Sequence, residues 1–243
     1  MDSGFYAACA GLIAKMQALD LAANNLANSG TAGYRGQREV FRQLLAGTVP
    51  VGQLNRVVNA YGVMGDTTTD FSQGSLQKTD NPLDFAIEGR AMFAVKTSEG
   101  VRYTRAGDFD LGADRKLVTQ DGDEVLGEQG AIRIPEGKLT VSDDGTLSIN
   151  GAVAGRLKLI EFNPATRLTP VGDAYYSAPT AAAQPAKGSV LRQGMIEGSN
   201  VQPLTAAVNL IAIQRNSESL QRALYLFHNE FNRIAAQELP RIG

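Results

Sequence analysis

Both ends of this chain carry apolar residues at alternating steps of four and three positions, which is the spacing of a helix that packs along one seam. The N-terminal series is Phe5, Cys9, Leu12, Met16, Leu19, Ala23 and Leu26. The C-terminal series is Leu210, Ile213, Ser217, Leu220, Leu224, Phe227, Phe231 and Ile234. We therefore expect two long helices at opposite ends of the chain.

Turn-forming residues set the expected helix limits. The first helix should stop near Asn28-Ser29-Gly30, where Gly30 is expected to take the left-handed conformation. The second should have Pro203 in its first turn and stop at Leu239-Pro240. One alternative is that each helix buries its apolar residues separately, against a globular domain of its own. We favour pairing of the two as a coiled coil, because each supplies the apolar surface that the other must bury.

Between the helices the apolar period changes to two, and Asp-Gly and Asn-Gly pairs separate the runs, which is typical of β-hairpins. Residues 117–118 and 125–126 flank one turn, and residues 139–141 and 147–149 flank Asp143-Asp144-Gly145. Asn150-Gly151 then leads toward another apolar run at 157–162. The prediction is an α+β protein with a central, mostly antiparallel β domain.

Four segments are expected along the chain. Residues 1–30 form the N-terminal helix, and residues 31–75, which are rich in Gly, Thr and Asn, form an extended connector. Residues 76–190 form the β-rich domain, and residues 191–243 contain the C-terminal helix.

The composition argues against several functional classes. The chain has one Cys, one His and no Trp, so we expect no metal site and no cofactor. A net charge of −2 lacks the basic footprint of a nucleic-acid binder. No apolar run reaches the length of about 18 residues that membrane insertion requires. The N-terminus lacks the basic and apolar regions of a cleavable signal peptide, and none is expected.

Paired carboxylates are the best catalytic candidates, but their positions favour turns. The pairs are Asp108/Asp110, Asp121/Asp123 and Asp143/Asp144. Each lies at an expected hairpin tip or strand end, where Asp bonds the local backbone. The single histidine, His228, lies in the C-terminal helical run. We therefore predict that the chain has no catalytic residue and is not an enzyme.

Asn24 and Asn28 lie one turn apart beside the first seam, where polar residues usually fix register or partner number. The stretch around them, LDLAANNLANSGTAGYR at 19–35, resembles the N-terminal signature of the flagellar basal-body rod and hook proteins. Further stretches resemble the family in the same order: FSQGSL at 71–76, NPLDFAI at 81–87, YTRAGDF at 103–109 and QGMIEGSNV at 193–201. The resemblance covers nearly the whole chain.

Within the family, the length and the compact β region are most similar to those of the proximal rod proteins, with the distal rod proteins as nearest rival. The sequence departs from the family pattern after Gln214-Arg215, where Asn216-Ser217-Glu218 replace an aromatic residue and Glu.

The resemblance implies a structural subunit of the bacterial flagellar rod that transmits torque. The terminal helices would pair as an inner domain of a helical assembly, with the β domain outside. Its partners would be proximal and distal rod proteins and further copies of itself. It would be exported by the flagellar type III apparatus, without a cleavable signal, to the rod crossing the periplasm.

A helical assembly needs heterologous contacts between subunits, and the two seams are able to supply them. We assign the assembly interface to Leu12, Met16, Leu19, Asn24, Asn25, Leu26, Asn28, Leu210, Ile213, Leu220, Leu224, Phe227 and Phe231. Other members of the same family, a cell-wall-acting enzyme and a soluble adaptor remain as alternatives.

Overall fold

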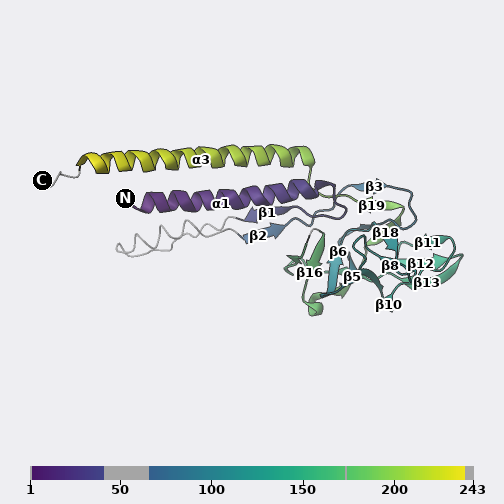
Figure 1. Ribbon diagram of the computed structural model, residues 1–243. Coiled ribbons are helices and arrows are strands. Elements are labelled where there is room, and N and C mark those ends of the chain that lie inside the picture. The colour runs from purple at the N-terminus through teal and green to yellow at the C-terminus, as the bar shows by residue number, and fades with distance from the viewer. Residues whose placement is uncertain (1, 41–65, 173, 239–243) are drawn as a thin grey trace. The chain divides into compact units, whose positions relative to one another are not determined.

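The computed structural model describes residues 2–40, 66–172 and 174–238 of the chain (Figure 1). The chain divides into two compact units. The helix unit comprises the described parts of 1–26, 37–68 and 203–243, and the β unit comprises the described parts of 27–36 and 69–202. The predicted α+β class, with two long terminal helices and a central antiparallel β region, is confirmed.

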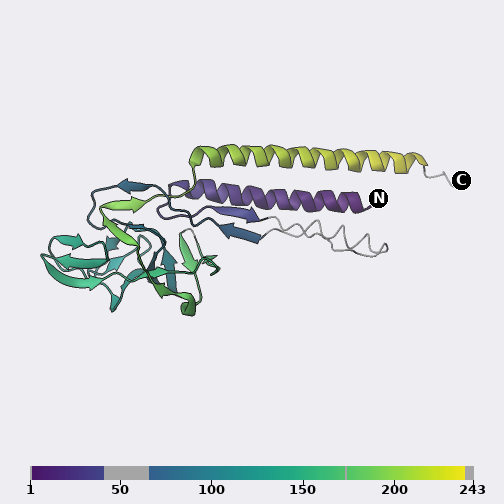
Figure 2. The same cartoon turned by 180° about the vertical axis from the view of Figure 1, so that it is seen from behind.

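The helix unit contains α1 (Asp2–Ala27) and α3 (Pro203–Glu238), which run in opposite directions (Figures 1 and 2). It also contains most of a two-stranded sheet of β1 (Gln37–Val40) and β2 (Asp66–Thr69), which lie inside the expected connector. A 3-10 turn, η1 (Asn28–Gly30), follows α1. Within the described residues, no helix combines the length and apolar character needed to cross a bilayer.

The helix limits agree with the sequence prediction, except for the left-handed residue. Pro203 is the first residue of α3, and α1 ends just before Asn28-Ser29-Gly30. The prediction for Gly30 was wrong, because the positive φ, 68°, belongs to Gly33. After α1 the chain forms a 3-10 turn at Asn28–Gly30. The left-handed residue is therefore Gly33, three residues after Gly30.

The exposure of α3 follows the predicted period. Ala206 and Ser217 are buried, whereas nearly all other described side chains of this helix are exposed to solvent or half-buried. The large half-buried residues continue the same steps of three and four: Leu210, Ile213, Leu220 and Leu224. This face of α3 is therefore the seam that the spacing predicts.

The exposure of α1 follows the predicted seam less closely. Met16 is 53% exposed, whereas Ala18, outside the seam series, is the buried residue among the described side chains of α1. A Cβ atom added at Gly11 would lie 4.0 Å from Leu220 Cδ2. The face of α1 that carries Gly11 therefore meets α3 at that level.

The β unit is built from short strands, and every strand pairing whose register is defined is antiparallel. The strands are β3 (Leu76–Lys78), β4 (Phe85–Glu88), β5 (Met92–Thr97), β6 (Gly100–Thr104), β7 (Asp110–Leu111), β8 (Leu117–Val118), β9 (Glu124–Gly127), β10 (Gly130–Ala131), β11 (Leu139–Val141), β12 (Thr146–Ile149), β13 (Ala152–Arg156), β14 (Leu159–Glu161), β15 (Thr169–Pro170), β16 (Tyr175–Ser177), β17 (Gln184–Pro185), β18 (Val190–Gln193) and β19 (Met195–Glu197). The β region thus continues past residue 190, and a 3-10 turn, η2 (Thr180–Ala182), precedes β17.

The largest sheet has the order β15-β16-β6-β5-β9-β8-β7, with β10, β14 and β17 attached beside this path. A second sheet has the order β11-β12-β13, and β18-β4 and β19-β3 form two-stranded ribbons. Both faces of β5 are buried. Phe93 belongs to one hydrophobic cluster with Phe85 and Phe109, and Met92 belongs to another with Tyr103 and Tyr176. The core therefore lies on both sides of β5.

Two of the predicted hairpins are present and one is different. β8 pairs with β9, and β11 pairs with β12, as expected. The turn at Asn150-Gly151 joins β12 to β13, and not to the apolar run at 157–162. That run contains β14, which pairs with β5 and β17. β13 is made mainly of small residues and is largely exposed, so it gives no apolar alternation in the sequence.

Candidate functional site

The predicted interface residues differ in exposure. Leu12, Leu19 and Leu26 of α1 are half-buried, and Asn24 is exposed. On α3, Leu210, Ile213, Leu220 and Leu224 are half-buried, as described above. The side chains of Phe227 and Phe231 lie outside the described part of the structure.

Asn25 and Asn28 make hydrogen bonds that fix the chain just after α1. Asn25 Nδ2 donates to the carbonyl of Gln37 at 2.8 Å, and the Gln37 amide donates to Asn25 Oδ1 at 2.9 Å. This pair of bonds imitates a strand partner and fixes the start of β1 to the end of α1. Asn28 Oδ1 accepts a bond from Thr31 Oγ1 at 3.1 Å, which stabilises the turn after the helix.

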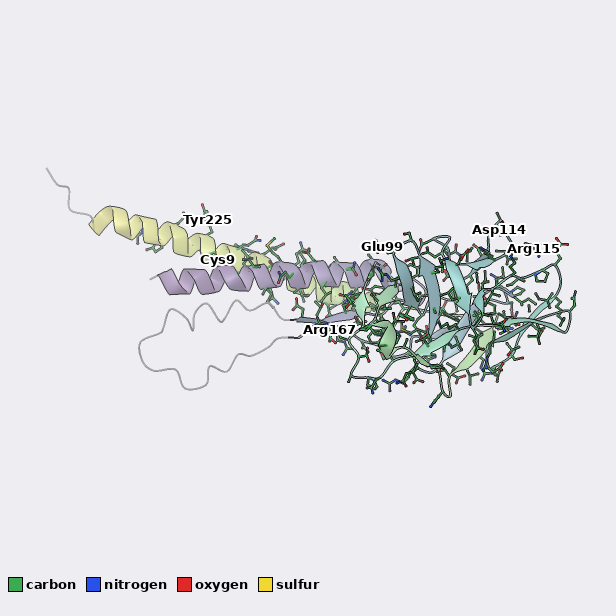
Figure 3. All side chains as sticks on the ribbon, turned by 90° about the horizontal axis from the view of Figure 1, so that it is seen from below. Cys9, Glu99, Asp114, Arg115, Arg167 and Tyr225 are labelled. Atoms are coloured by element: carbon green, nitrogen blue, oxygen red, sulfur yellow. The ribbon has the colours of Figure 1, made fainter. Side chains whose placement is uncertain are left out.

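Large apolar side chains are exposed along both helices. On α1 these are Ile13 and Met16. On α3 they are Leu204, Val208, Ile211, Tyr225 and Leu226, with Leu204 80% exposed, and Figure 3 shows Tyr225 projecting from the helix. We call these seven side chains the exposed helix stripe. Large apolar side chains that are exposed along a helix are surface that a partner would bury.

A buried ionic cluster in the β unit was not predicted from the sequence. It consists of Arg35, Arg105 and Glu197, whose side chains are 1%, 4% and 0% exposed, and we call it the junction. Glu197 Oε1 accepts from Arg35 Nη2 at 2.5 Å, and Oε2 accepts from Arg105 Nε at 2.8 Å. The main-chain amide of Gly74 also donates to Oε1, at 2.9 Å. The carboxylate therefore has charged or polar donors on both oxygens.

Arg105 makes further bonds to three main-chain carbonyls. Its Nη2 donates to Ile87 at 3.0 Å, and its Nη1 donates to Gly89 at 2.9 Å and also to Ala91. Burial lowers the pKa of the Arg105 guanidinium from its ordinary value, while Glu197 acts in the opposite direction. The guanidinium is thus fully used as a donor and holds β4 to the start of β5.

Hydrogen bonds of the main chain and of the Asn200 side chain join the same segments around the junction. The Gly33 amide donates to the Glu197 carbonyl at 2.7 Å, and the Gly36 amide donates to Asn200 Oδ1 at 2.8 Å. Asn200 Nδ2 donates in turn to the carbonyl of Asp70 at 2.8 Å. Residues 33–36, 70–74 and 197–200 are therefore held together as one structure.

Two glycines are required by this packing. A Cβ atom at Gly33 would lie 2.1 Å from the Ala106 nitrogen, and one at Gly74 would lie 2.0 Å from the Gly198 oxygen. Both distances are far below van der Waals contact. These glycines belong to stretches that carry the family resemblance, and four of those stretches (19–35, 71–76, 103–109 and 193–201) supply the junction and its surroundings.

Asp144 and Asp121 of the acidic pairs accept hydrogen bonds from nearby groups. Asp144 Oδ1 accepts from the Thr146 amide at 3.1 Å, and these turn bonds lower the pKa of Asp144. Asp121 Oδ2 accepts from the Tyr175 hydroxyl at 3.0 Å. Burial, followed by neighbouring carboxylates, raises the pKa of Asp108. Within the described ranges, no group of three or more His, Cys, Asp or Glu side chains is arranged to hold a metal ion.

Three family models match the chain. The flagella basal body rod protein model matches residues 5–35, the flagellar hook protein FlgE/F/G D1 domain matches residues 86–149, and the flagellar basal body rod FlgEFG protein C-terminal model matches residues 192–224. The first model covers most of α1 and the last covers the first half of α3.

Similar proteins match over nearly their full length. Flagellar basal-body rod protein FlgF of Caulobacter vibrioides is 34% identical over 100% of both chains, and FlgF of Salmonella typhimurium is 32% identical over 92% of this chain and 93% of its own. FlgG of Bacillus subtilis is 29% identical over 90% of this chain and 92% of its own. The chain belongs to the family of flagellar basal-body rod proteins.

Proposed function

We propose that this chain is a subunit of the proximal part of the flagellar rod, and that it assembles helically through α1 and α3 to transmit torque. The observation that carries the proposal is the exposed helix stripe. Most of the large apolar side chains that are exposed in the described residues lie on these two helices. An isolated subunit leaves this surface in water, whereas a neighbouring subunit would bury it.

The stripe and the seam occupy different positions on α3. Leu204, Val208 and Ile211 are exposed, whereas Ala206, Leu210 and Ile213 are buried or half-buried. One face of α3 is thus available to α1 of the same chain, and another is available to a second subunit. We propose that α1 and α3 pair as a coiled coil and that the stripe makes the heterologous contacts of a non-closing assembly.

The similarity to FlgF proteins supports the proximal position. The two FlgF relatives described above are more similar to this chain than the FlgG relative, although some FlgG proteins reach 32% identity. We propose that other rod proteins and further copies of this chain are its partners, and that the flagellar type III apparatus exports it to the rod in the periplasm. A distal position is the alternative.

Replacement of Leu19 by Asp tests the role of the helices. Leu19 is half-buried on α1, and a carboxylate there would place charge within the seam. We expect Leu19→Asp to be exported and to keep a folded β unit, but to be absent from purified hook-basal bodies in quantitative mass spectrometry. Val153→Asp is the matched control, because Val153 is 72% exposed on β13 of the β unit.

Normal incorporation of Leu19→Asp, or equal loss of Val153→Asp, would contradict assembly through the helices. The same preparations distinguish the proximal from the distal position. A small fixed copy number, lower than that of the distal rod protein, is expected for a proximal subunit. A copy number equal to or above it would favour the distal alternative.

A further inference from the structure

We propose that the junction sets the axial register of α1 against α3, with Glu197 as the positioning residue. The chain segment that follows α1 and the segment that precedes α3 are bonded to each other there. Arg35 comes shortly after η1, and Glu197 ends β19 just before α3. The inference concerns contacts within one chain and goes beyond the proposed role in the rod.

The pairing of these two segments leaves no freedom to slide. Gly33 is bonded to Glu197, the Asn200 amide donates to the Tyr34 carbonyl at 3.4 Å, and Gly36 is bonded to Asn200. These three bonds join Gly33 to Glu197, and both Tyr34 and Gly36 to Asn200. A shift of one residue would break all of them and would separate the Arg35 guanidinium from its carboxylate.

The links from the junction to the helices are short and bonded. Between Ala27 and Gly33 the chain forms η1, and the Thr31 and Tyr34 amides donate to the carbonyls of Asn28 and Thr31 at 3.2 and 3.3 Å. On the other side, the Val201 amide donates to Ser199 Oγ at 3.1 Å, two residues before α3 begins. Both links are therefore short, and each contains at least one hydrogen bond.

The contact within the helix unit agrees with this register. From Ala27 back to Gly11, α1 spans about 24 Å, and from Pro203 to Leu220, α3 spans about 26 Å, at 1.5 Å per residue. These are the two positions that face each other, since a Cβ atom at Gly11 would lie 4.0 Å from Leu220. Gly11 and Leu220 therefore lie at nearly equal distances along their helices from Ala27 and Pro203.

The burial of the charged side chains of the junction favours a role in positioning the helices over a role in stability alone. Buried ion pairs add little stability compared with apolar residues of similar size, and fixing of register is their best-attested use. Here the register matters, because a slip of one residue turns a helix by about 100° relative to its partner, and the seam would then face away.

Cross-linking of engineered cysteine pairs by a short bis-maleimide, in the isolated full-length chain, tests the inference. The single cysteine is removed as Cys9→Ser, and Gly11→Cys is combined with Leu220→Cys (in register) or with Leu224→Cys (one turn out of register). The ratio of the two cross-linking yields reports the register. In the parent, the in-register pair should dominate.

Glu197→Gln keeps the shape of the side chain and removes its charge. We expect it to lower the ratio by a factor of about five or more, since a shift of 1 kcal/mol changes a population by roughly this factor. Arg35→Lys, which keeps the charge but lacks the forked geometry, should lower the ratio as well and serves if Glu197→Gln does not fold.

Leu147→Ala is the control for a merely structural role. Leu147 is 0% exposed in the core of the β unit and pairs with Val141, so its truncation destabilises the fold at a site that makes no bond to the junction. Its ratio should equal that of the parent. The inference is overturned by an unchanged ratio in a folded junction variant, by an equal fall in Leu147→Ala, or by the absence of in-register cross-linking in the parent.

Discussion

Replacement of Arg105 by Met measures how strongly the junction stabilises the β unit. Met retains most of the apolar stem, so the cavity that the change creates is small. The loss is electrostatic, because Glu197 is left with Arg35 as its remaining cationic partner and the carbonyls of Ile87, Gly89 and Ala91 lose their guanidinium donor. Glu197 and Ala91 are buried, so their groups cannot turn to water without opening the core, whereas Gly89 is exposed.

The magnitude follows from the burial of the pair. Removal of one partner from a buried ion pair costs about 3–5 kcal/mol. Since Arg35 still neutralises Glu197, this contribution lies at the lower end, and the loss of the guanidinium bonds to the carbonyls adds about 1 kcal/mol. We expect Arg105→Met to lower the free energy of unfolding by about 4 kcal/mol, and the melting temperature by roughly 10 °C for a domain of this size.

Chemical denaturation followed by near-UV circular dichroism of the tyrosines gives the required free energy, since the chain has seven Tyr and no Trp. Arg192→Met is the matched control. Arg192 pairs with Glu88 at 3.2 Å, but the two side chains are 44% and 55% exposed. Its loss should be below about 1 kcal/mol. A loss for Arg105→Met below about 1.5 kcal/mol would refute the reasoning from buried charge.

Two further predictions concern other parts of the chain. Asn25→Ala removes both bonds to the main chain of Gln37 and should cost about 1–2 kcal/mol, seen as faster hydrogen exchange of the Gln37 amide; unchanged exchange would contradict this. Burial raises the pKa of Tyr176 to about 12, above its value of about 10 in the unfolded chain, so this contribution to stability is complete below pH 10 and is lost as the pH rises toward 12. Denaturation at increasing pH should show a shallower loss for Tyr176→Phe than for the parent, and parallel curves would count against the assignment.

The helices were predictable because their signal is local. The period of the apolar residues marks α1 and α3, and Pro203 marks the start of α3. The spacing does not show which side of a helix a partner covers. Met16 satisfies the period and is 53% exposed, whereas Ala18, outside it, is buried. The side that is covered depends on contacts between α1 and other elements, and the spacing of residues within one helix carries no information about those contacts.

The junction was not predictable from spacing because its residues are far apart in sequence. Arg35 and Glu197 are 162 positions apart, and Arg105 and Glu197 are 92 apart. Charged residues in Gly-rich stretches ordinarily lie at the surface. The resemblance marked the stretches that contain them, but it did not show that they meet. Their pairing follows from the course of the whole β unit.

The separation of the junction residues along the chain also orders the folding of the protein. A contact between positions 35 and 197 closes a loop that contains almost the entire β unit, so it carries a large entropic cost and forms after local hairpins such as β11–β12. When the chain appears N-terminus first, Arg35 and Arg105 are present before Glu197. The two guanidinium groups therefore lack their carboxylate partner until Glu197 has also appeared. The β unit is therefore completed by nearly its last residues, immediately before α3 begins.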